Sequence, residues 1–212
     1  MNAQDTVSDV WCDLMRRHGC NAASAEATLD NLVHAYSEPH RHYHALNHIA
    51  ELLRLLEEHG DVSDRPAVTL AILFHDIVYD PVRQDNEAAS AELAKDRLAL
   101  LGLPQQLVAK VERYIRATQH GASAPAAEDV DLHRLLDLDL SVLAAASDRY
   151  RAYAQAIRRE YAAVPDELYR PGRRRVLEEF LARRQIYITE RLSALWEAPA
   201  RANLESEISR LT

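Results

Sequence analysis

Residues 67–81, AVTLAILFHDIVYDP, constrain the fold more than any other segment of the chain. The run from Ala67 to Phe74 is almost wholly apolar, and His75 and Asp76 follow it at once. Such a run predicts a buried helix, so the two ionisable side chains within it should be buried as well. A buried charge costs several kcal/mol unless it is paired or coordinates a metal. The segment therefore predicts either a His–Asp pair that satisfies itself in the core or a metal site.

A second group of metal-binding side chains comes earlier in the chain. Residues 40–48, HRHYHALNH, hold four of the ten histidines. His44 and His48 are four residues apart, so they share one face once a helix has begun. This face could present imidazoles to the His75–Asp76 pair.

A third segment supplies carboxylates. Residues 135–143, LLDLDLSVL, place Asp137 and Asp139 in another leucine-rich helix. Carboxylates two residues apart point to different sides of a helix, so only one of them should face inward. Imidazoles and carboxylates from three helices suit a divalent metal such as Zn, Mn, Fe, Co, Ni or Mg, as one or two ions. A helical bundle is a natural place for such side chains to converge.

The rest of the chain also has helical apolar spacing, which predicts an all-α fold of nine or ten helices. Gly19, Gly60 and Gly102 each follow an apolar helical run and fit the left-handed residue just past a helix. Pro66 and Pro165 fit helix starts. The expected loops lie near 37–43, 60–65, 80–86, 119–128 and 163–172.

Length and charge limit the classes of function. A chain of 212 residues suits one domain or one domain with an appendage. We expect a metal-binding helical core in residues 1–148 and a C-terminal helical extension in 149–212, packed on the same domain. The net charge of −8 argues against a double-stranded nucleic acid as partner. This net charge is compatible with a local basic pocket that binds a small phosphorylated ligand.

The expected location is the cytoplasm, with no membrane contact. The N-terminus, MNAQDTVSDVW, lacks the basic start and apolar run of a signal peptide, and no stretch approaches the roughly 18 apolar residues of a membrane span. Cys12 and Cys20 are too few for a disulfide framework, so their thiols should be reduced. A homodimer is compatible with these features.

The order of His, then His-Asp, then Asp on helices resembles the HD-domain superfamily of metal-dependent phosphohydrolases. Residues 43–49, YHALNHI, are also similar to the YHNxxHA signature of cyclic-nucleotide phosphodiesterases, with Ala45 where that signature has Asn. A bacterial group of predicted metal-dependent HD-superfamily phosphohydrolases is similar over nearly the whole chain. The segments that carry this last resemblance are YSEPHRHYHALNHI (36–49), LFHDIVYDP (73–81), NEAASA (86–91), LDLDLSVL (136–143) and YAQAIRREYAAVP (153–165).

The resemblance implies an HD-domain helical bundle and a set of roles. The implied metal ligands are His48, His75, Asp76 and Asp139. Asp139 is preferred to Asp137 because the family's last ligand is the second acid of a DxD-like stretch. His44 takes the role of general acid, and Asp76 is the bridging ligand if two ions bind.

Other residues are weaker candidates for the site. Glu87 could orient water or bind a second metal, or it could simply occupy the first turn of a helix capped by Asp85 or Asn86. His120 could join the site or lie at a solvated helix end. Three arginines could bind phosphate oxygens or could simply be solvated at the surface. They are Arg41, Arg83 and, in the run RPGRRR (170–175), Arg173.

The predicted function is hydrolysis of a nucleotide or another small phosphate ester, with a metal-activated water as nucleophile and His44 as proton donor. One alternative is a non-catalytic nucleotide-binding or regulatory HD module that keeps a structural metal. Another is an HD-type di-iron oxygenase, which needs two further histidines before the last Asp. Only His120 and His133 lie in that interval, and they fit it poorly.

Overall fold

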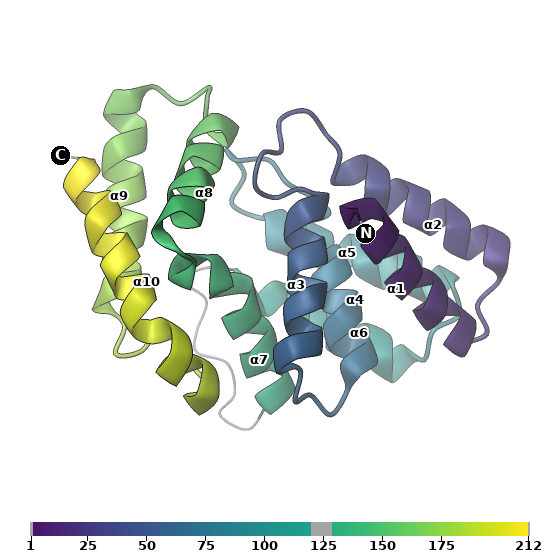
Figure 1. Ribbon diagram of the computed structural model, residues 1–212. Helices are drawn as coiled ribbons and strands as arrows, with labels where there is room; N and C mark the ends of the chain where they lie inside the picture. The colour runs from purple at the N-terminus through teal and green to yellow at the C-terminus, as the bar shows by residue number, and fades with distance from the viewer. Residues whose placement is uncertain (1, 120–128, 212) are drawn as a thin grey trace. The chain divides into compact units, whose positions relative to one another are not determined.

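The computed structural model describes residues 2–119 and 129–211. Within these residues the chain forms ten α-helices and one 3₁₀-helix and contains no strand, which confirms the predicted all-α class (Figure 1). The chain divides into two compact units, Met1–Leu135 and Leu136–Thr212, and the division falls inside α7 (Val130–Asp139). That residues 149–212 extend a domain formed by 1–148 stays a prediction. His120 lies outside the described residues.

The first unit consists of consecutive amphipathic or apolar helices joined by short loops. Its helices are α1 (Ala3–Arg17), α2 (Ala22–Ala35), α3 (Leu46–His59), α4 (Arg65–Phe74), α5 (Asn86–Leu100), α6 (Gln105–Ala117) and the start of α7. α1 packs on both α2 and α3, and the indole nitrogen of Trp11 donates a hydrogen bond of 2.9 Å to the carbonyl oxygen of Ala25 in α2. α5 packs along α6.

α4 is the centre of this unit. It contacts α3, α5 and α6, and no residue from Ala67 to Phe74 is more than 7% exposed. Its start follows the predicted pattern, because Asp64 accepts a hydrogen bond from the backbone N–H of Ala67 and Pro66 stands in the first turn. A helix that is covered on every side delivers the residues at its C-terminal end into an apolar interior.

Two of the three predicted helix-ending glycines adopt the left-handed conformation. Gly19 and Gly102 have φ values of 67° and 77°. Gly60 follows α3 as expected, but its φ is −81°, so the left-handed conformation predicted there is wrong. Glycine is required at this position for another reason, since a Cβ atom would lie 1.8 Å from the carbonyl oxygen of Leu56.

The second unit consists of the end of α7 and the elements that follow it. These are η1 (Leu140–Ala144), α8 (Ser147–Glu160), α9 (Asp166–Ala182) and α10 (Glu190–Arg210). α10 packs against η1, α8 and α9. α9 begins directly after Pro165, as predicted, but it continues through Pro171, so the loop expected at 163–172 is shorter than predicted.

None of the helices in the described part of the chain combines the length and the hydropathy that crossing a bilayer requires. Cys12 and Cys20 are both free.

Candidate metal centre

Three of the four predicted ligands meet at one buried point in the first unit. His48 lies in the first turn of α3, His75 is the C-cap of α4, and Asp76 is the next residue. Nε2 of His75 lies 3.3 Å from Nε2 of His48 and 3.1 Å from Oδ2 of Asp76. One ligand atom from each residue lies within 4.8 Å of the other two. His48 and His75 are only 6% and 2% exposed, whereas the side chain of Asp76 is 16% exposed, so the two imidazoles are buried and the carboxylate is partly open to solvent.

The His75–Asp76 pair stands at the end of the apolar helix and not inside it. The sequence predicts that the helix continues through the pair, but α4 ends at Phe74 and Asp76 lies in the turn that follows. The C-terminal end of a helix leaves carbonyl groups without partners within the helix. One of them, the carbonyl oxygen of Ile72, is contacted by the ring of His75 itself.

The orientation of the His75 ring prepares it as a ligand. Its Nδ1 lies 2.9 Å from the carbonyl oxygen of Ile72. A carbonyl oxygen only accepts hydrogen bonds, so Nδ1 carries a proton, and Nε2 presents a lone pair whenever the ring is neutral. Metal-binding histidines are commonly held in this way, with the second ring nitrogen donating to a carbonyl or carboxylate. Nε2 of His75 is directed at the space shared with His48 and Asp76.

Arg41, in the histidine-rich loop before α3, holds the turn after α4. Its guanidinium donates to the carbonyl oxygens of Asp76 at 2.6 Å and of Ile77 at 2.9 Å. The same group donates to the carbonyl oxygen of His44 at 3.2 Å and to the carboxylate of Glu38 at 2.9 Å. The side chain of Arg41 is only 1% exposed, so all of its donors are turned into the protein. Arg41 therefore links the histidine-rich loop to the metal-binding turn, and it is not exposed as a phosphate clamp.

His44 lies next to this group but not on the helix. The sequence places His44 and His48 on one helical face, yet α3 begins at Leu46, so the loop and not the helix sets the position of His44. Its ring stacks on Tyr79 with the ring centres 4.3 Å apart. The centre of the ring lies 6.2 Å from that of His48. This distance brings His44 near the candidate site without making it one of the clustered ligands.

The start of α5 packs against the chain that follows Asp76. The hydroxyl of Ser90, which is fully buried, accepts a hydrogen bond from the N–H of Val78 and donates one to its carbonyl oxygen. Asn86 exchanges two hydrogen bonds with the backbone of Asp80. Glu87 lies in the first turn of α5, as one reading of the sequence expects, and three residues before Ser90 on the same face. A site role for Glu87 stays a prediction.

The two carboxylates of the third segment lie in the second unit. Asp137 accepts hydrogen bonds from the N–H groups of Ile188 and Thr189 at 2.7 and 2.8 Å and from the Thr189 hydroxyl. It therefore holds the two residues that directly precede α10. Asp139, which the resemblance favours over Asp137 as the fourth ligand, is the last residue of α7. The assignment of Asp139 stays a prediction, and the structural role of Asp137 is consistent with it.

The other arginines considered as phosphate clamps are bound to carboxylates. Arg83 pairs with Asp85 through two hydrogen bonds of 2.8 and 2.9 Å. Arg173, inside α9, donates to both carboxylate oxygens of Glu207 in the second unit. Neither guanidinium is left over for a ligand in this arrangement.

Two tyrosines of the site are not predicted from the sequence. The hydroxyl of Tyr36 accepts a hydrogen bond of 3.3 Å from the N–H of Asp76, and Arg41 lies over the rings of both Tyr36 and Tyr79. Tyr36 and Tyr79 stand just before the histidine-rich loop and just after the His75–Asp76 pair. Only this closeness to the two motifs could have indicated them.

Comparison of the chain with models of known protein families, with curated proteins and with solved structures gives no match.

Proposed function

We propose that this chain is a metal-dependent phosphohydrolase whose divalent metal is held by His48, His75 and Asp76. The fourth ligand that the resemblance implies, Asp139, stays a prediction from the sequence. The observation that carries the proposal is the position of His75 Nε2. It faces a second imidazole nitrogen at 3.3 Å and a carboxylate oxygen at 3.1 Å in a buried position. Two imidazoles and a carboxylate form the ligand set of many catalytic sites for Zn and neighbouring metals.

The buried position supports a metal over a self-satisfied pair. If His75 Nε2 is an acceptor, it repels the Asp76 carboxylate unless a proton or a cation lies between them. A divalent cation satisfies His48, His75 and Asp76 together, whereas a single proton satisfies only one pair. When bound, such a metal lowers the pKa of water and offsets charge on phosphoryl oxygens.

The chain's own residues take the remaining tasks. His44 donates a proton to the leaving oxygen, for which an imidazole is suited near neutral pH. Arg41 binds the backbone carbonyl oxygens of both Asp76 and His44 and so fixes the position of the ligand relative to the proton donor. Glu87 orients the attacking water from the start of α5. The substrate class is a nucleotide or another small phosphate ester.

Turnover by metal-loaded protein tests this function. We expect release of phosphate from members of a panel of nucleotides and sugar phosphates after loading with Mn²⁺, Zn²⁺, Co²⁺ or Ni²⁺. His75→Ala should abolish it, and His34→Ala, which removes an exposed histidine of α2, should leave it intact. Tight metal binding without turnover of any substrate would instead favour the non-catalytic module with a structural metal.

A further inference from the structure

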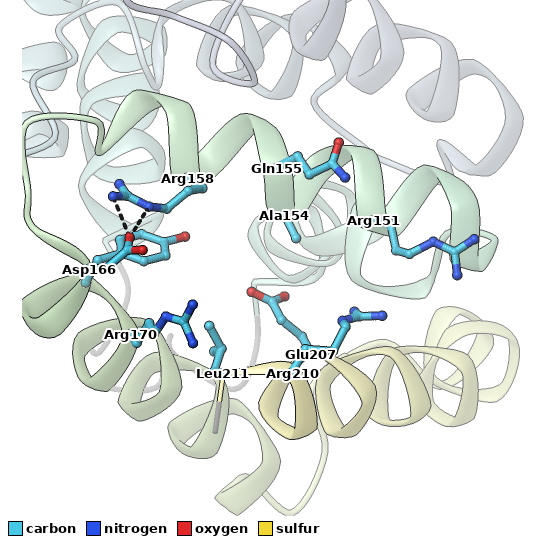
Figure 2. Close-up of a pocket in the computed structure, with 10 residues that line it drawn as sticks. Arg151, Ala154, Gln155, Arg158, Asp166, Arg170, Glu207, Arg210 and Leu211 are labelled. Atoms are coloured by element: carbon cyan, nitrogen blue, oxygen red, sulfur yellow. Dashed lines mark hydrogen bonds and ion pairs between the residues drawn. The ribbon is translucent and has the colours of Figure 1, made fainter.

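The second unit contains a pocket of its own, formed by α8, α9 and α10 (Figure 2). Its volume is about 360 Å³. Pockets that hold small molecules in proteins commonly span roughly 300 to 1,000 Å³. The pocket is therefore large enough for a small ligand, and the phosphohydrolase proposal makes no use of it.

Positive charge dominates the lining. All three helices contribute arginines, which are Arg151, Arg158, Arg170 and Arg210. The acidic lining residues are Asp166 and Glu207. This balance contrasts with the chain as a whole, whose net charge is −8.

Both acidic groups are already neutralised by the protein. Asp166 pairs with Arg158, with distances of 3.0 Å to Nε and 2.7 Å to Nη2, as the dashed lines in Figure 2 mark. Arg158 is also bound to the carbonyl oxygens of Tyr161 and Val164. This arginine is thus a structural part of the pocket wall.

Glu207 is neutralised more completely. Its carboxylate accepts hydrogen bonds of 2.8 and 3.1 Å from Arg173 and one of 2.5 Å from the hydroxyl of Tyr150. Burial, and after it the charge of Glu207, raises the pKa of Tyr150 far above the usual value for a tyrosine, so the hydroxyl stays a donor. Since its oxygens are occupied by two donors, Glu207 competes weakly for the remaining arginines.

Arg170 and Arg210 are the arginines left over. Neither forms a hydrogen bond or an ion pair with any other residue in the part of the chain that the structure describes, and both are exposed. Figure 2 shows Arg170 on α9 and Arg210 on α10 on either side of the Glu207 carboxylate in this view. Arg151, at the rim, is held by Asp148 one turn away.

We propose that this pocket binds a small molecule through a multivalent oxyanion, a phosphoryl or polycarboxylate group, held between Arg170 and Arg210. Guanidinium groups present paired N–H donors that match carboxylate and phosphate oxygens. Because Glu207 and Arg158 are each paired with other groups of the protein, Arg170 and Arg210 determine the charge that a ligand meets in the pocket. The pocket lies entirely within the second unit, so the inference does not depend on the metal centre.

Calorimetric titration of the full chain tests the proposal. The protein is freed of metal with a chelator, so that binding at the candidate metal centre does not contribute. The probes are inorganic pyrophosphate and citrate, titrated separately. The variants are Arg170→Gln on α9 and Arg210→Gln on α10. Arg174→Gln is the matched control, since Arg174 also lies on α9 but pairs with Glu178 outside the pocket lining.

We expect at least one probe to bind with one site per chain. Arg170→Gln and Arg210→Gln should each weaken its affinity about 10-fold or more, as loss of a charge-assisted hydrogen bond does, while Arg174→Gln should leave the affinity unchanged. Binding of pyrophosphate alone would assign a phosphorylated ligand, binding of citrate alone a carboxylate ligand, and equal binding an unselective oxyanion site.

Two results would overturn the proposal. One is the absence of binding by either probe at millimolar concentration. The other is binding that Arg170→Gln and Arg210→Gln leave as strong as in the wild type. Far-ultraviolet circular dichroism checks that each variant keeps its helices, and because the two variants lie on different helices, either one that folds decides the question.

Discussion

Nη1 of Arg41 lies 2.6 Å from the carbonyl oxygen of Asp76. This hydrogen bond joins the histidine-rich loop before α3 to the turn after α4, which come from distant parts of the chain. The donor is a side chain that is only 1% exposed, and the acceptor belongs to a residue of the candidate metal centre. The geometry of the centre therefore depends on a residue that is not itself one of its ligands.

Replacement of Arg41 tests this dependence. Arg41→Lys keeps the charge but loses the planar fork that reaches Asp76 and Ile77 together. We expect the free energy of unfolding to fall by about 1–3 kcal/mol, because buried carbonyl groups lose their donors. Metal affinity should fall as well, because the turn that carries Asp76 is less fixed. Urea unfolding and metal titration measure the two effects.

The matched control for this change is Arg83→Lys, whose guanidinium pairs with a neighbouring carboxylate at the surface. It should change stability and metal affinity little, as exposed ion pairs usually contribute little. Equal stability and metal affinity in Arg41→Lys and Arg83→Lys would contradict the linking role of Arg41.

Asp137 and Asp139 should respond differently to mutation. Asp137→Ala removes the acceptor for two backbone N–H groups just before α10, so it should lower the free energy of unfolding by about 1–2 kcal/mol and spare metal binding. Asp139→Ala should reduce metal binding and activity. Thermal unfolding and metal content separate the two roles. Loss of metal in Asp137→Ala with retention in Asp139→Ala would reverse the assignment.

Buried tyrosines should make the fold sensitive to alkaline pH. Burial raises the pKa of Tyr169 to about 12, and burial followed by nearby carboxylates raises the pKa of Tyr187 further. A tyrosine whose pKa is higher in the folded than in the unfolded chain stabilises the folded state. This contribution is fully present below the pKa in the unfolded chain, which is about 10. It is lost as the pH rises towards and through the pKa in the folded chain. The free energy of unfolding should therefore decline from about pH 10 upwards, by about 1.4 kcal/mol per pH unit for each such tyrosine.

Tyr187→Phe isolates one of these contributions. The variant loses a hydrogen bond to the carbonyl oxygen of Leu140, so it should be less stable at neutral pH. Its stability should decline less steeply above pH 10, because phenylalanine does not titrate. Urea unfolding at neutral and alkaline pH gives both values, and an unchanged alkaline slope would show that Tyr187 is not buried as described.

Mutation of His44 should affect catalysis without affecting metal binding. With its ring stacked on Tyr79, His44 lies close to His48 without joining the clustered ligands. His44→Ala should keep the metal and lose about 10²- to 10⁴-fold in rate, the usual contribution of a positioned proton donor. The loss should be smaller for a nitrophenyl ester, whose leaving group needs less protonation. His42→Ala, an exposed histidine of the same loop, is the control. Loss of metal in His44→Ala would make His44 a ligand.

Local patterns in the sequence predict the parts of the fold that depend on local interactions. The apolar run before His75 predicts the buried α4, and Gly19 and Gly102 mark helix ends through the left-handed backbone that glycine favours. The meeting of His48 with the His75–Asp76 pair agrees with the ligand set that the resemblance implies.

Long-range contacts explain what local patterns miss. The helix stops before His75, and the turn that follows it is held by Arg41, far away in the sequence, through the carbonyl oxygens of Asp76 and Ile77. The position of His44 is likewise set by stacking on Tyr79 and not by helical spacing. Gly60 has an ordinary φ and is needed only because Leu56 comes too close for a side chain.

The most direct test of the metal centre is an anomalous difference map from crystals grown with Zn²⁺ or Mn²⁺, with Asp76→Ala crystals as control. We expect one strong peak contacted by Nε2 of His48, Nε2 of His75 and a carboxylate oxygen of Asp76, at about 2.0–2.2 Å if the metal is zinc. The peak should be absent in Asp76→Ala. A map without a peak at saturating metal, in which His75 and Asp76 bond only to each other, would contradict the metal centre and the function proposed from it.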